Sequence, residues 1–349
     1  MGNIPPVIIV STGRCGSTLL SEMLALHPDI LSLSEVFMAI NTRAFVHREL
    51  DGSKFWSLMS KPRFSMSRIL TPETCSQEFK FDFARSERYT QDTLPPILYM
   101  ALPRLSDDPE ALYRELERTI LDRGNASLSD QYNFMFNWLR ERFEKKVWIE
   151  RSGGSLMFVT SLSRLFPDAR FVHLYRDGRD VACSMQHYPS LRLLARSWHS
   201  LKKIGIDLLR PPFRIGDSKA IYFAEDFLAP LYGIDSRLKE EVDLEIIARF
   251  WSEMVLTGLE ALSKIPEERR FNLSYEDLVS DTPTKLTQLL QFIHPDLSNN
   301  LWTEESARLV KHQPREAMLD SSSQRKLTAA CAPGLKALGY AITPPIAAD

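Results

Sequence analysis

The chain has 349 residues, of which 44% are hydrophobic and 25% are charged, and its formal net charge is −2. This length is enough for one large α/β domain, and the near-neutral charge argues against a general binder of nucleic acid or of anionic membranes. No apolar run approaches the roughly 20 residues of a membrane helix, and the N-terminus lacks a signal-peptide pattern. We therefore expect a cytoplasmic enzyme that holds any anion with a local set of donors.

The first predicted elements are a strand, a glycine-containing turn and a helix. Val7–Val10 is an apolar run that predicts a buried parallel strand. Ser17–Leu26 then carries apolar residues at helical spacing. Residues 40–143 are rich in Arg, Phe and Met and show helical patterns such as Pro109–Arg123. We expect a mostly helical insertion or cap there, with a helix beginning after Thr71.

A regular alternation of strand and helix returns after the cap. Lys145–Glu150 and Ala169–Arg176 predict strands, and Leu244–Leu262 predicts a long helix. Residues 190–243 are less regular, and the tail from Asn299 is charged and partly helical. The alternation predicts a single α/β domain over 1–349, with a central parallel sheet and helices on both faces. Ligands of such folds bind at the carboxyl ends of the strands.

The turn "STGRCGSTLL" has the properties of an anion site. Gly13 and Gly16 let the backbone wrap closely around phosphate oxygens, and Ser17 and Thr18 add hydroxyls at a helix N-terminus. Arg14 adds a fixed charge with a forked donor set. An ATP-binding P-loop requires a different glycine spacing and a lysine where Ser17 stands. The loop therefore predicts a site for a phosphate ester that is bound without a Walker A lysine.

The same loop closely resembles the 5′-phosphosulfate loop of sulfotransferases that use 3′-phosphoadenosine 5′-phosphosulfate (PAPS). The resemblance implies that Arg14, Gly16, Ser17 and Thr18 wrap the 5′-phosphate and sulfate, with Cys15 standing where the family has serine. Ser17 likewise stands where the family has threonine, and both substitutions keep a small side chain. Four cysteines, namely Cys15, Cys75, Cys183 and Cys331, show no metal-type spacing, so we expect reduced thiols and no metal site.

A second loop, "YRDGRDVACSM", matches the family element that reads the 3′-phosphate. In the family an arginine ends a strand and a serine follows eight residues later, and here Arg176 and Ser184 have that spacing. We expect Gly178 to allow the turn between them. Arg179 and Asp180 are either a capping pair or a solvated pair. The two loops occur in the same order and in the same strand–helix contexts as in the family, and together they indicate a PAPS site.

Glu35 stands 21 residues after Arg14. In tyrosylprotein sulfotransferases, which this chain resembles in layout, a glutamate at that offset acts as general base. The alternative is an ordinary capping acid. His27 is a rival base, although its place at a helix end favours a role at the C-terminal dipole.

Arg151 occupies the place of a family lysine, 25 residues before Arg176. Arginine stabilises charge but does not readily donate a proton, so we expect an electrostatic clamp; the alternative is a structural pair with Glu150 or another acid. The resemblance also places Tyr275 near the adenosine and implies that Arg325 closes over the 3′-phosphate, with a solvated face as the alternative for Arg325. We read Trp251 as core and Glu276 and Asp277 as helix caps.

The resemblance, which covers residues 5–37, 146–188 and 244–340, implies transfer of a sulfuryl group from PAPS to a hydroxyl, with PAP released and no metal required. The acceptor is expected to be a small molecule or carrier-bound, and the sequence does not identify it. Lys54–Met59 and Asn133–Trp138 either line an apolar pocket or pack in the core. A kinase-like phosphotransferase with a degenerate P-loop and a non-catalytic nucleotide-binding protein remain as alternatives.

Overall fold

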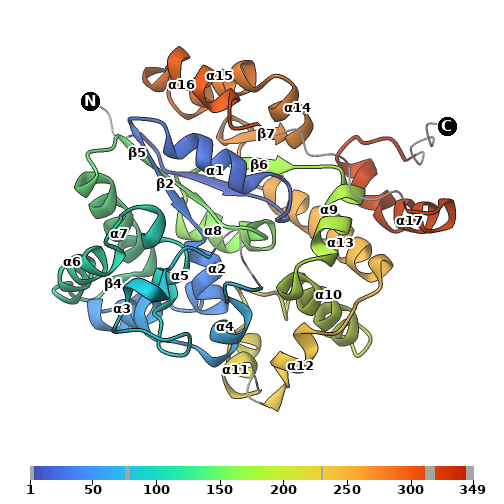
Figure 1. Cartoon of the computed structure of the whole chain (residues 1–349), viewed down its shortest axis with the longest axis horizontal. Helices are drawn as coiled ribbons and strands as arrows, with labels where there is room; N and C mark the ends of the chain where they lie inside the picture. Colours follow the sequence, from blue (N-terminus) through green and yellow to red (C-terminus); the bar gives the residue numbers. More distant parts are fainter. Residues whose placement is uncertain (1–3, 75–78, 229–230, 311–318, 343–349) are drawn as a thin grey trace.

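A five-stranded parallel sheet organises the part of the chain that the computed structural model describes, namely residues 4–74, 79–228, 231–310 and 319–342 (Figure 1). Side chains are not described for 225–228. The strand order is β2-β5-β1-β6-β7, and a separate antiparallel pair joins β3 to β4. The strands are β1 (Val7–Val10), β2 (Ile30–Ser34), β3 (Glu49–Leu50), β4 (Ala126–Ser127), β5 (Val147–Arg151), β6 (Arg170–Tyr175) and β7 (Arg270–Ser274).

Helices surround the sheet and make up most of the remaining chain (Figure 1). The α-helices are α1 (Ser17–Ala25), α2 (Val36–Ile40), α3 (Gly52–Ser60), α4 (Phe64–Ile69), α5 (Pro96–Tyr99), α6 (Pro109–Leu121), α7 (Leu128–Arg142), α8 (Val159–Leu165), α9 (Gly178–Gln186), α10 (Pro189–Lys202), α11 (Lys219–Leu228), α12 (Ile234–Leu238), α13 (Leu244–Leu262), α14 (Tyr275–Ser280), α15 (Thr282–Ile293), α16 (Asn300–Ala307) and α17 (Ser321–Ala337). The 3-10 helices are η1 (Asn41–Ala44), η2 (Phe83–Arg85), η3 (Leu102–Arg104), η4 (Ser155–Phe158), η6 (Glu267–Arg269) and η7 (Pro295–Leu297).

The central strands are buried, as their continuous apolar runs predict. All residues of β1, β2 and β5 are buried, because a parallel sheet is covered by helices on its faces. Helix α1 packs against β2, and α13 packs against α9, α10 and α17. Trp251 of α13 is 1% exposed, in agreement with the core position predicted for it. The predicted α/β fold is therefore confirmed.

Two segments differ in detail from the sequence-based expectation. Residues 190–243, expected to be less regular, contain most of α10 together with α11 and α12. The helix expected after Thr71 is not seen in the described residues: 72–74 form a turn, and 75–78 lie outside the description. No helix in the described ranges has the length and hydropathy to cross a bilayer.

The aromatic segments of the cap belong to the core. Phe55 and Phe136 are fully buried, and Trp56 is 4% exposed. Phe136 packs on Trp148 of β5 with ring centroids 4.8 Å apart. This contact ties α7 to the central sheet, so the packing alternative is the correct one for these segments.

Candidate active site

The carboxyl ends of the five parallel strands bring the predicted site residues to one edge of the sheet. Glu35 directly follows β2, Arg151 ends β5, Arg176 follows β6 and Tyr275 follows β7. The loop that contains Arg14 follows β1. The strand order therefore puts Glu35 and Arg151 on one side of this loop and Arg176 and Tyr275 on the other.

The first loop has the backbone conformation that an anion site needs. Gly13, Arg14 and Gly16 have φ values of 78°, 58° and 85°, which lie in the left-handed region. Gly16 is the N-cap of α1 and supplies no side-chain cap, so the amide groups at this helix start face the site. A Cβ at position 16 would lie 2.2 Å from a ring carbon of Tyr275, so glycine is required there. Ser17 and Thr18 line the adjoining cavity.

Cys15 directs its side chain away from that cavity. Its thiol is fully buried and lies 3.5 Å from the carbonyl oxygen of Leu174 in β6. Burial raises the pKa of this thiol, so it stays protonated. Only the backbone of Cys15 is placed to contact a ligand, and core packing accounts for the small side chain.

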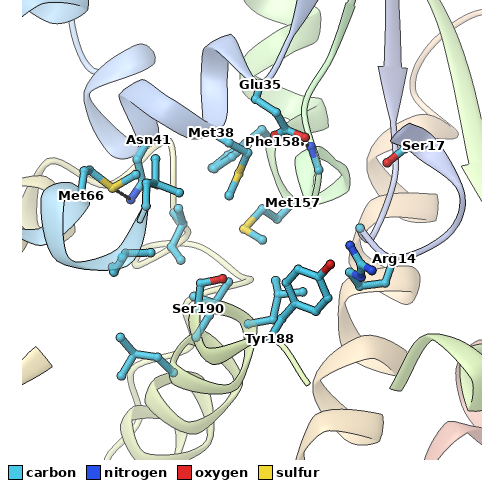
Figure 2. A pocket seen from close by; sticks show the side chains of 18 of the residues that line it. Arg14, Ser17, Glu35, Met38, Asn41, Met66, Met157, Phe158, Tyr188 and Ser190 are labelled. Atoms are coloured by element: carbon cyan, nitrogen blue, oxygen red, sulfur yellow. Dashed lines mark hydrogen bonds between the residues drawn. The ribbon is translucent and has the colours of Figure 1, made fainter. Parts of the chain in front are cut away.

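Arg14 joins the two loops that the sequence singled out separately. Its Nε donates a hydrogen bond of 3.2 Å to the hydroxyl of Ser184. The guanidinium also stacks on the ring of Tyr188, 3.6 Å from the ring centroid, and Figure 2 shows the two side chains in contact. A ligand between the loops would therefore meet Arg14 and Ser184 together.

Arg176 lies on the other side of the first loop. It pairs with Asp180 at 3.2 Å and lies over the ring of Tyr275, 4.6 Å from the centroid. Its Nε is buried and has no partner among the residues that the structure describes. Arg176, Ser184 and Tyr275 all line the cavity, so a cationic group with an unused donor lies beside an aromatic ring.

Gly178 serves packing, and the turn role predicted for it is wrong. It does not have a positive φ, and a Cβ there would lie 2.2 Å from the ring of Trp251. The start of α9 therefore approaches α13 more closely than any other residue would allow. Asp177 caps α9 by accepting from the Arg179 amide at 2.9 Å.

Glu276, which follows the neighbouring strand β7, holds the turn between β6 and α9. Glu276 accepts from the Asp177 amide at 3.0 Å and from the Tyr340 hydroxyl at 2.7 Å. The cap of α14 is instead Ser274, which accepts from the Asp277 amide at 3.0 Å. The capping role predicted for Glu276 and Asp277 is therefore wrong: Glu276 braces two strand ends, and the Asp277 carboxylate pairs with Lys285 at 3.6 Å.

Glu35 and Arg151 form a buried ion pair between adjacent strand ends. The Arg151 guanidinium contacts the Glu35 carboxylate, and their side chains are 1% and 6% exposed, respectively. The Gly153 amide donates to the other carboxylate oxygen at 3.0 Å, and the Glu35 amide donates to the Arg151 carbonyl at 2.8 Å. Glu35 itself has a φ of 61°. These contacts hold the carboxylate in one orientation, and both residues line the cavity.

A second carboxyl, which sequence reasoning did not assign to the site, lies behind this pair. Glu150 accepts from the Ser152 hydroxyl at 2.6 Å and from the Val36 amide at 3.2 Å. Burial, with the nearby Glu35 charge adding to it, raises the pKa of Glu150 to about 8. The group is therefore protonated at neutral pH. A carboxyl inside the otherwise apolar run of β5 was the signal available in the sequence.

A cavity of about 1190 Å³ connects the two loops with the Glu35–Arg151 pair. Arg14, Glu35, Arg151 and Arg176 lie on its wall. Figure 2 shows Met38, Met157 and Phe158 between Glu35 and the side chains of α10. The cavity thus has a charged end at the sheet edge and an apolar continuation.

Comparison with known proteins decides the family. A model of the sulfotransferase family matches residues 5–214, which is more than half of the chain. The chain belongs to the sulfotransferase family. No curated protein matches this sulfotransferase.

The solved structures similar to this chain include other sulfotransferases, at low identity. The sulfotransferase domain from the curacin biosynthetic pathway is 17% identical with a TM-score of 0.45, over 98% of this chain and 100% of that one. The domain from the Synechococcus PCC 7002 olefin synthase is 16% identical with a TM-score of 0.44, over 97% and 95%. A sulfotransferase from Mycobacterium avium is 14% identical with a TM-score of 0.42, over 98% and 78%.

Two candidate residues of this sulfotransferase lie away from the cavity. Arg325 is exposed on α17 and is not among the residues lining the cavity. His27 is 1% exposed; its Nδ1 accepts from the Asp29 amide at 3.1 Å, and its Nε2 lies 2.9 Å from the Leu297 carbonyl. With both ring nitrogens bonded and its pKa lowered by burial, His27 is a neutral structural residue.

Proposed function

We propose that this sulfotransferase moves the sulfuryl group from PAPS to a hydroxyl group of its acceptor and releases PAP. The observation that carries the proposal is the contact between Arg14 and Ser184. It puts a loop suited to a 5′-phosphosulfate and a loop suited to a 3′-phosphate on the wall of one cavity. A donor with two separate anionic groups fits this arrangement better than a nucleoside triphosphate.

The donor set matches the two ends of PAPS. Arg14, the backbone of Cys15 and Gly16, and the hydroxyls of Ser17 and Thr18 would hold the 5′-phosphosulfate. The Nε atoms of Arg176 and Arg151 are buried without partners among the described residues, and both side chains line the cavity, so each can donate to an anion there.

The 3′-phosphate would lie between Arg176 and Ser184, with the adenine against Tyr275. Tyr275 already lies over Arg176 and against Gly16, so the ring adjoins both phosphate loops. Arg325 is left out of the proposed donor site because it is exposed and is not among the residues that line the cavity.

The reaction is an in-line displacement at sulfur. The acceptor oxygen forms a new S–O bond, and its proton passes to the Glu35 carboxylate. The bond between sulfur and the bridging oxygen breaks, and its electron pair remains on the 5′-phosphate of PAP. Arg151 and Arg14 neutralise the charge that develops there, which is catalysis by positioning and electrostatics. Arg151 acts as a clamp because a guanidinium does not readily give up a proton.

Ligand-induced stabilisation tests the donor assignment. A ligand that binds the folded state raises Tm according to its affinity. PAP should raise Tm clearly more than AMP or ATP at equal concentration. Equal shifts from PAP and AMP would overturn the assignment of a 3′-phosphate site.

A further inference from the structure

The apolar continuation of the cavity points to the class of acceptor. We define the apolar arm as the part of the cavity lined by α2, η4, α4, α10, α11, α12 and residues 204–215. Met38, Met157 and Phe158 begin it next to Glu35 (Figure 2). Leu194, Ile206 and Ile221 continue it.

Two segments distant in sequence build this arm together. Helix α4 comes from the cap, whereas α10 to α12 come from residues 189–238, and α12 contacts both α4 and α10. Leu193, Ile234 and Leu238 form a buried cluster of their own, with Ile69 of α4 packed against it. These helices gather at the end of the molecule opposite α15 and α16 (Figure 1). The arm therefore has a formed wall that is separate from the main core.

The wall offers no buried charge to an acceptor. Among the described residues that line the arm, Arg237 is the one charged side chain. Its Nε donates to the Tyr232 carbonyl at 2.8 Å, and it stacks on the Tyr232 ring at 4.3 Å. The Ser197 hydroxyl bonds the Leu193 carbonyl at 2.7 Å and the Tyr232 hydroxyl at 3.0 Å. Three more hydroxyl side chains line the arm, those of Ser65, Ser190 and Ser200. A charged or many-hydroxyl acceptor would lose more hydration here than these few polar groups replace.

The arm reaches the surface at an apolar rim. Ile204 and Tyr232 line the cavity and are 72% and 37% exposed. Phe223 and Leu231, which neighbour lining residues in the sequence, are 54% and 83% exposed. Exposed apolar side chains that line a cavity, as Ile204 and Tyr232 do, are typical of a binding surface. The rim extends the apolar path from Glu35 to solvent.

We propose that the acceptor is an uncharged alcohol with a long aliphatic chain. Its hydroxyl lies at Glu35 while the chain occupies the apolar arm towards the rim. This inference rests on the proposed function, because the arm leads to the residues assigned there to proton removal. The methionines at the inner end suit a flexible chain, since thioether side chains adapt their packing.

Calorimetric titration of the full-length protein with alcohols tests the arm without turnover. Affinity should rise roughly tenfold from 1-octanol to 1-decanol, because each buried methylene contributes a roughly constant increment. Diethylene glycol monobutyl ether, a chain as long as decanol with two methylenes replaced by oxygens, should bind much more weakly. Equal affinity for the three compounds would overturn the inference.

Matched substitutions locate the binding. Leu194→Glu puts a charge on the half-buried arm wall and should weaken decanol binding at least tenfold. Leu301→Glu makes the same change on α16, where Leu301 is 72% exposed. This variant should bind decanol as wild type does. Ile221→Glu on α11 is a second arm variant, should the first fail to fold. Unchanged decanol binding in a folded arm variant would contradict the arm as the site.

Transfer of labelled sulfate from PAPS then separates the two proposals. The product yield per unit enzyme should follow the same order, with decanol above octanol and the ether lowest. If PAP stabilises the protein more than AMP but chain length affects neither binding nor transfer, the acceptor inference fails and the donor assignment stands. If chain length controls binding but PAP has no advantage over AMP, the proposed function fails and the arm assignment stands.

Discussion

Glu35 and Arg151 are 116 residues apart in sequence and form a buried ion pair at the ends of neighbouring strands. For Arg151, the sequence left open whether it is an electrostatic clamp or a structural ion-pair partner, and the pair is compatible with both roles. The arginine does pair structurally with an acid, but that acid is Glu35, the proposed base. The clamp and the base are therefore one unit, and a change in either affects the other.

The Glu35→Gln variant should lose catalysis but keep its donor site. We expect turnover to fall about 10²–10⁴-fold, as for removal of a general base, while the Tm shift with PAP remains. Stability should fall by up to about 3–5 kcal/mol, because Arg151 is left buried without a countercharge. Urea unfolding and a transfer assay measure the two effects.

Glu304→Gln is the control for this variant. Glu304 is exposed on α16, so its substitution should change neither quantity. Turnover close to wild type in Glu35→Gln would place the base elsewhere.

The Arg176→Ala variant should abolish the preference for PAP over AMP. Losing a charge-assisted contact of about 1.5–3 kcal/mol weakens PAP roughly 10–100-fold and leaves AMP little changed. Titrations with both nucleotides measure the ratio. Arg249→Ala removes an arginine that is 59% exposed on α13 and should keep the wild-type ratio. A preserved PAP preference in Arg176→Ala would contradict the 3′-phosphate assignment.

Glu150 should give the protein a pH-dependent stability. A carboxyl whose pKa rises on folding stabilises the folded state at pH values below its unfolded pKa, and this contribution is lost as the pH rises towards the folded value of about 8. Between about pH 6.5 and 7.5 the group should lower the free energy of unfolding by roughly 1.4 kcal/mol per pH unit.

Glu150→Gln should remove that slope, because the amide imitates the protonated acid. Urea unfolding at several pH values compares the two proteins. His173, whose pKa burial lowers to about 4, adds a slope of opposite sign because its unfolded form still titrates in this range. That slope is common to both proteins, so the difference between them reports Glu150. Equal slopes in wild type and variant would show that Glu150 is ionised in the folded protein.

The Gly178→Ala variant should separate α9 from α13. Its Cβ would lie 2.2 Å from the Trp251 ring, and overpacking of this kind costs about 1–3 kcal/mol. PAP affinity should fall as well, because α9 carries Ser184. Gly124→Ala is the matched control, with no atom within 4 Å of the new Cβ, and should stay within about 0.5 kcal/mol of wild type. Equal stability of the two variants would contradict the close approach.

Local sequence patterns predicted much of the sheet edge. The strand runs at Val7–Val10 and Ala169–Arg176, the glycine turn and the spacing of Arg176 and Ser184 all lie within short segments. Backbone hydrogen bonding and side-chain periodicity act over such distances, so these elements follow from neighbouring residues. The parallel sheet then places their ends together.

Tertiary structure alone decided which groups share an environment. The sequence offered Glu150 or another acid as a structural partner for Arg151, and strand pairing gave that place to Glu35 and left Glu150 buried and protonated. Gly178 proved to be a packing contact with Trp251, and the apolar arm arose where α4 meets α10 and α12, which lie far from it in sequence. The physical reason is that burial and ion pairing depend on distances in space, which strand order and helix packing set between residues far apart in the chain.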